Sequence, residues 1–71
     1  MTEDEVVDIA KHLASTKGWP WIDPVQVNRK RRLFGKRFWT VLTNCDGIGS
    51  NVYIEVDESS RAVVKSVFRK R

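Results

Sequence analysis

The sequence holds few of the residues that build disulfides, metal centres or membrane spans. It has one cysteine, Cys45, and one histidine, His12, which excludes an internal disulfide and a Cys/His zinc cluster. Its longest apolar stretch, residues 38–45, is far too short to cross a bilayer. The acidic opening lacks the basic and apolar segments of a signal peptide. We therefore expect a single cytoplasmic domain, residues 1–71, with no cofactor, no metal ion and no membrane partner.

Catalytic constellations are scarce as well. Cys45 stands beside Asp46, and nothing in the sequence places His12 near it as the base that a nucleophilic cysteine needs. Residues 47–51 (GIGSN) contain Gly-x-Gly but lack the third glycine and the following helix of a dinucleotide-binding loop. These glycines are better interpreted as turn residues. We predict that the protein is not an enzyme.

Charge is distributed unevenly along the chain. The net charge is +4, yet residues 1–8 contain four acidic and no basic residues. The rest holds thirteen basic and five acidic residues, a balance of +8. A basic body indicates an acidic partner, such as nucleic acid, a membrane surface or an acidic protein, or it serves solubility alone.

The N-terminal part has the pattern of an amphipathic helix over residues 3–17. Thr2 and Glu5 have the spacing of a capping box, and Gly18 stands where a left-handed residue ends a helix. The apolar residues that recur at helical spacing are Val6, Ile9, Ala10 and Leu13.

The remainder predicts four strands joined by short turns. The strand segments are 25–33, 38–44, 51–57 and 62–69, and each is rich in β-branched or aromatic residues or alternates in polarity. Turn residues separate them. Short connections favour antiparallel neighbours, so we predict an α+β fold in which one N-terminal helix packs on a four-stranded antiparallel meander sheet.

Two tryptophans stand between the helix and the first strand, in the segment Trp19-Pro20-Trp21. They could form a loop that stacks on a ligand, or they could cover the end of a thin core. A domain this small needs large apolar side chains in its core, which favours the second interpretation.

A single helix leaves one sheet face uncovered, and strand alternation predicts which residues lie there. In the third strand Tyr53 faces away from the buried set Val52, Ile54 and Val56. In the fourth, alternation exposes Val63 and Val67 and buries Ala62, Val64, Ser66 and Phe68. In the second strand, alternation does not decide whether Phe38 or Trp39 points inward. The larger side chain of Trp39 favours Trp39 as the inward residue.

This uncovered face is predicted to carry an apolar patch rimmed by basic residues. Such a patch often marks a contact surface, although long basic side chains could instead lay their stems over it. The residues predicted to bind protein are Phe38, Trp39, Tyr53, Val63 and Val67.

The most basic stretch is residues 28–39 (NRKRRLFGKRFW), in which six of twelve residues are Lys or Arg. Charges at a hairpin can keep an exposed strand edge from pairing with another chain, or they can grip phosphates. The helix begins with acidic residues and is a poor recognition helix, which favours edge protection. The alternative nucleic-acid site comprises Arg29, Lys30, Arg31, Arg32, Lys36, Arg37, Arg69, Lys70 and Arg71.

The last half of the chain resembles PepSY-like domains and small bacterial toxin-immunity proteins. Residues 51–68 (NVYIEVDESSRAVVKSVF) resemble their strand-turn-strand, and the segment from Phe38 to Asn51 resembles the Trp-bearing strand and Gly–Asn loop of the immunity group. The order of elements is similar to a cystatin-type helix plus meander. The matching positions are Trp39, Gly49, Asn51, Asp57 and Ser60.

The resemblance has two departures. Arg61 replaces the turn glycine, so it must adopt a left-handed conformation or the turn is of another type. The glycines of the cystatin inhibitory loop have no counterpart. The likeness implies a non-enzymatic binding or inhibitory module, often bacterial. The first hypothesis is therefore a protein-interaction module with a protein partner or a second copy, and the alternative is a nucleic-acid-binding protein.

Overall fold

The computed structural model describes residues 1–31, 35–47 and 49–70, and it confirms the predicted α+β fold. A single helix, α1 (Glu3–Thr16), precedes the strands. These are β1 (Gln26–Arg31), β2 (Arg37–Leu42), β3 (Asn51–Asp57) and β4 (Val63–Arg69). Arg32 and Arg71, two of the residues predicted for the alternative nucleic-acid site, lie outside the described residues.

Both ends of α1 are fixed as the sequence predicts. The Glu5 backbone N–H donates to Thr2 Oγ1 at 3.2 Å, and the Thr2 N–H donates back to Glu5 Oε1 at 3.1 Å. This reciprocal pair is a capping box. At the other end Gly18 has φ +70°, the left-handed conformation that glycine adopts without steric cost.

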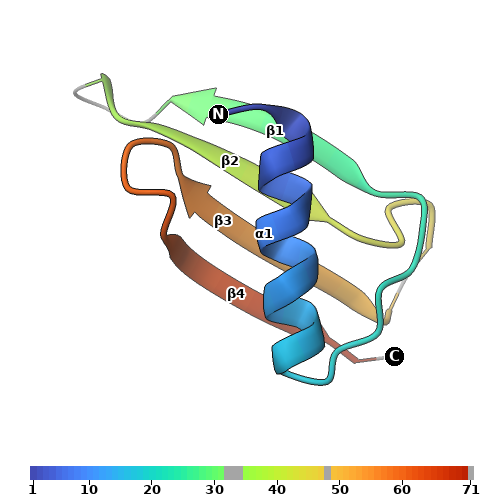
Figure 1. The fold of residues 1–71 in the computed structure, drawn as a ribbon. Coiled ribbons are helices and arrows are strands. Elements are labelled where there is room, and N and C mark those ends of the chain that lie inside the picture. The colour runs from blue at the N-terminus through green and yellow to red at the C-terminus, as the bar shows by residue number, and fades with distance from the viewer. Residues whose placement is uncertain (32–34, 48, 71) are drawn as a thin grey trace.

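The four strands form one sheet in the order β1-β2-β3-β4, and every neighbouring pair is antiparallel. The predicted meander is thus confirmed. Figure 1 shows α1 crossing one face of this sheet, and its contacts are with β2 and β3. No helix or strand of the described part of the chain packs on the other face.

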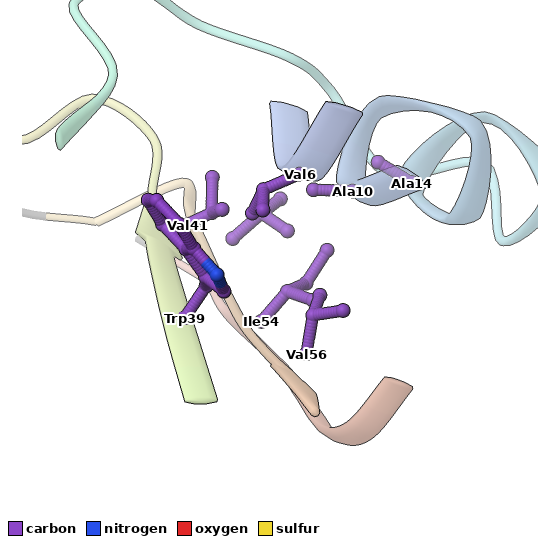
Figure 2. Close-up of a cluster of buried hydrophobic side chains, with 8 residues drawn as sticks. Val6, Ala10, Ala14, Trp39, Val41, Ile54 and Val56 are labelled. Carbon is purple, nitrogen blue, oxygen red and sulfur yellow. The ribbon is translucent and has the colours of Figure 1, made fainter. Parts of the chain in front are cut away.

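The core lies between α1 and the two central strands. Figure 2 shows side chains of α1 and of the sheet projecting into one shared layer. Ala10 and Ala14 are small, which lets the helix approach the strands closely. The buried hydrophobic residues are Val6, Ala10, Ala14, Trp39, Val41, Val52, Ile54 and Val56.

The aromatic residues settle two questions that the sequence left open. Trp39 points inward and is 7% exposed, so Phe38 lies on the opposite face. Trp19 and Trp21 are half-buried against the core, which confirms their predicted covering position. Trp19 stacks on Phe68 with the ring centres 5.8 Å apart.

The parity predicted for the start of the fourth strand was wrong. Val63 packs against the core, whereas Val64 is 56% exposed and Ala62 is also exposed. The reason is a β-bulge: Val56 pairs with Val63 and Glu55 pairs with Lys65, so Val64 is one residue in excess. The extra residue reverses the alternation on its N-terminal side.

Candidate functional site

We call the sheet face opposite α1 the open face. Its residues follow from the register, because residues that oppose each other in antiparallel strands point to the same side. Leu42 pairs with Tyr53, which pairs with Val67, and these three form one row across three strands. The next row is Thr40, Glu55 and Lys65.

The first row forms the floor of a shallow groove of about 370 Å³. Lys65 and Arg69 line it on the β4 side, and Gly47 and Asn51 line it at the loop end. The groove therefore combines an apolar floor with two cationic side chains. Apolar concave surfaces with a few fixed polar groups are typical of binding sites.

The second row makes the centre of the open face polar. Tyr53 Oη donates a hydrogen bond to Glu55 Oε2 at 2.7 Å, and Lys65 Nζ lies 6.0 Å from the centre of the Tyr53 ring. Glu55 and Thr40 are both buried. The predicted apolar patch with a basic rim did not include the buried polar residues Glu55 and Thr40. The signal was present, because residues two apart on a strand share a face.

Beyond this polar centre lies a second apolar area, where Phe38 and Val64 line a depression together with Lys36 and Arg37. Within the described ranges, the exposed large hydrophobic residues are Val64 at 56% and Val67 at 45%. The open face thus carries two apolar areas separated by the Glu55–Lys65 row.

The five predicted protein-binding residues divide between the two faces of the sheet. Phe38, Tyr53 and Val67 lie on the open face as predicted. Trp39 and Val63 pack against the core under α1, so neither contributes to an open-face site. The alternation of the second strand had not decided whether Trp39 points inward. Val63 was assigned to the wrong face because of the bulge.

The loop between β2 and β3 is locked beside the groove by Asn51. Its Nδ2 donates to the backbone oxygens of Thr43 at 2.9 Å and Asn44 at 3.0 Å, and its Oδ1 accepts from the Gly49 N–H at 2.9 Å. Asn44, Gly49 and Ser50 all have positive φ values, of 50°, 90° and 52°. Gly47 and Gly49 thus lie in the loop before β3, as their interpretation as turn residues predicted, and the hydrogen bonds of Asn51 give the groove a rigid end.

The turn between β3 and β4 is organised by Asp57. Its Oδ2 accepts from the Ser60 N–H at 3.0 Å and from the hydroxyls of Ser60 and Ser59 at 2.8 and 2.9 Å. These hydrogen bonds, the Ser60 N–H foremost, lower the pKa of Asp57. Arg61 has φ +60°, so it takes the left-handed conformation that a glycine would otherwise supply.

Arg29 is engaged within the fold rather than held free for an anion. Its Nε lies 3.3 Å from Glu58 Oε1, and its guanidinium stands 5.7 Å from the centre of the Trp39 ring. The indole Nε1 of Trp39 donates to the same Glu58 oxygen at 3.2 Å. Arg29 therefore neutralises a neighbouring carboxylate, which weakens its case as a phosphate contact.

The other basic residues do not gather on one surface. In the strand register, Arg31 of β1 lies opposite Arg37 of β2 at one end of the sheet. Arg69 of β4 lies opposite Asn51 of β3 at the other end. Figure 1 shows β4 ending at the opposite end of the sheet from the one where β1 ends and β2 begins. The seven residues of β4 separate these ends by about 20 Å.

Several cations do gather where β1 ends and β2 begins, because Arg29, Lys30, Arg31 and Arg37 line one depression there. In an antiparallel meander each strand reverses the direction of the one before. The fourth strand therefore ends at the opposite end of the sheet from the turn that joins the first two strands. The separation of hairpin and tail was therefore implicit in the predicted meander.

Within the three described segments, no group of three or more His, Cys, Asp and Glu residues lies where it could hold a metal ion. Nor does any described helix have the length and apolar character needed to cross a membrane. Comparison of the chain with protein-family models, with curated proteins and with solved structures finds no match.

Proposed function

We propose that this chain is a small non-enzymatic protein-interaction module, of inhibitor or immunity type, which binds a partner protein through its open face. The observation that carries the proposal is the row of Leu42, Tyr53 and Val67, which forms an apolar groove on a face that no described element covers. An exposed apolar area with a polar surround is typical of a contact surface. The free cysteine, Cys45, supports a reducing, cytoplasmic setting.

The proposed mechanism is steric binding by a preorganised surface. The groove floor stands on strands, and its loop end is fixed by the three hydrogen bonds of Asn51. The Tyr53–Glu55 hydrogen bond holds the phenol in one orientation. Little ordering is then required when a partner places an apolar side chain between Val67 and Leu42, and this lowers the entropic cost of association.

The test begins with affinity capture from the source cell and identification of the bound protein, followed by binding measurements with the purified partner. Leu42→Lys should weaken binding by about tenfold or more, because it puts a charge on the groove floor. Lys11→Ala, on the exposed side of α1, is the matched control and should bind as the parent does. Hydrogen-exchange protection by the partner should fall on β2, β3 and β4. A partner that binds the Leu42 variant equally well, or protects α1 instead, would contradict the proposal.

A second candidate function is nucleic-acid binding at the hairpin end, supported by the four basic side chains that line one depression there. If about five phosphates are neutralised, affinity for duplex DNA should fall with salt at a log–log slope of about −4 to −5. Replacing Arg31, Arg32, Lys36 and Arg37 together by Gln should flatten that slope. Weak binding without a steep salt dependence would instead leave these charges as protection of the β1 edge.

A further inference from the structure

The two edge strands of the sheet differ in how they are protected. On β1, Arg29, Lys30 and Arg31 are exposed, and charged side chains on an edge discourage pairing with another chain. On β4, exposed Lys65 and Arg69 stand among Val64 and Val67, the exposed large hydrophobic residues of the described chain. The free edge of β4 is therefore flanked by exposed apolar side chains, which β1 lacks, as well as by two cations.

We propose that β4 pairs antiparallel with β4 of a second copy of this chain, about a two-fold axis at Ser66, to form a homodimer with one continuous sheet. The inference goes beyond the proposed function, because it uses a strand edge instead of the open face, and it does not depend on that function. Pairing at an edge satisfies backbone groups that the monomer leaves to water.

The register follows from charge. With Ser66 opposite Ser66 of the second copy, Lys65 stands opposite Val67, and the aliphatic stem of each lysine covers a valine. A register shifted to Val67 would oppose Lys65 to Arg69, and one shifted to Lys65 would oppose two lysines. The pairing centred on Ser66 is the one of these that places no like charges opposite each other.

A second copy is the occupant that this edge fits best. Pairing β4 with β1 of another copy would leave free edges at both ends and grow without closing. It would also place β4 against a strand in which Arg29, Lys30 and Arg31 follow one another. Pairing β4 with β4 closes after two copies and leaves only the charge-protected β1 edges exposed.

This symmetry fixes the arrangement of the dimer. Opposed residues in antiparallel strands point to the same side, so the two-fold axis is perpendicular to the sheet. Both copies of α1 then lie on one side of the sheet, and the two open faces adjoin on the other. Val67 of each copy lies near the axis, which brings the two apolar grooves together on one surface.

The first experiment is sedimentation equilibrium from micromolar to millimolar concentration, because a seven-residue edge forms a small and weak interface. We expect the parent protein to dimerise reversibly. In this register residue 67 of each copy lies opposite Lys65 of the other. Val67→Lys therefore places two lysines opposite each other at two positions, and Val67→Glu places a glutamate opposite a lysine at both. The dissociation constant should therefore rise and fall, respectively, by roughly three- to tenfold. The same two substitutions at Asn28, exposed on β1, measure the effect of net charge alone.

The second experiment tests the register by cross-linking in a Cys45→Ser background. Directly opposed residues have Cα atoms about 4.5–5.5 Å apart, within the range of a disulfide. Ser66→Cys should therefore oxidise to a covalent dimer faster than Val67→Cys, because two copies of Val67 are only diagonal neighbours.

Three results would overturn the proposal. The parent protein could remain monomeric at millimolar concentration. Val67→Lys and Val67→Glu could shift dimerisation equally, which would remove Lys65 of the second copy from the contact. Val67→Cys could cross-link faster than Ser66→Cys, which would indicate a dimer packed through the open faces. The last result would leave the proposed function of the open face intact.

Discussion

On the α1 side of the sheet, Val41, Ile54 and Val56 are fully buried under the helix. On the open face, the same two strands carry both polar and apolar side chains. The first face is held by close packing. The second is held by the hydrogen bond of Tyr53 to Glu55 and by the Asn51 network at its end. The contrast shows that the two faces of one sheet are stabilised by different interactions.

The largest expected effect lies on the covered face. Ile54→Ala removes a fully buried side chain between α1 and β3, so it should lower the free energy of unfolding by about 2–4 kcal/mol. Val64→Ala, a smaller truncation at an exposed position on the other face, should cost about 0.5 kcal/mol or less. Urea unfolding of both variants measures the difference. Comparable losses would erase the distinction between the two faces.

The next effect concerns the rigid end of the groove. Asn51→Ala leaves the Gly49 N–H and the oxygens of Thr43 and Asn44 without their side-chain partner. We expect a loss of about 2 kcal/mol, since partners left unpaired cost more than the bond itself contributes. Asn28→Ala, on an exposed position of β1, is the matched control and should change stability little. Hydrogen exchange at the Gly49 amide should speed up in the Asn51 variant alone.

Tyr53→Phe probes the open face with a smaller change. It removes one hydroxyl and leaves the ring, so the shape of the groove floor is kept. Loss of the hydrogen bond to the buried Glu55 carboxylate should lower the free energy of unfolding by about 1 kcal/mol. Thermal unfolding gives the value. No measurable change would mean that the polar centre of the open face contributes nothing to stability.

The smallest effect is one of pH and belongs to the turn that connects β3 to β4. The pKa of Asp57 is lowered in the folded protein by the Ser60 N–H and by the Ser60 and Ser59 hydroxyls. The stability that this provides is present above the unfolded pKa of about 4 and is lost as the pH falls through the lower folded pKa.

Asp57→Asn should therefore be less stable than the parent at neutral pH and should lose less stability on acidification. Glu5 has a lowered pKa as well, chiefly through the Thr2 backbone N–H, so part of the acid dependence should remain. Urea midpoints at pH 7 and pH 3 test this, with Ser15→Ala on the exposed surface of α1 as control. A parallel pH response in the parent and the Asp57 variant would contradict the assignment.

The sequence was sufficient for the order and type of the elements because their signals are local. The Thr2 and Glu5 capping pair, the helical spacing of Val6 and Ala10, and turn residues between β-branched segments each depend on neighbours in the chain. The antiparallel meander follows from short connections. These features need no knowledge of which residues meet across the sheet.

The composition of the open face depends on such knowledge, and its prediction was correct only in part. Alternation assumes that each residue has one partner, so the extra residue at Val64 reversed the assignment of Val63. The contact of Arg29 with Glu58 joins β1 to the turn after β3, and no sequence spacing indicates it. Whether Phe38 or Trp39 points inward could be decided only by knowing which face of the sheet the helix covers.

The contacts of α1 with β2 and β3 have a consequence for vectorial synthesis on the ribosome. The helix is made first, but the strands that cover Val6, Ala10 and Ala14 emerge only after a further forty residues or so, a few seconds at about 5–20 residues per second. A fourteen-residue helix is marginal by itself in water. We therefore expect the α1 segment to fold stably only once β3 has been made and the sheet can cover the helix. A chain cut in the loop before β1 should accordingly give two fragments that fold only when they are mixed.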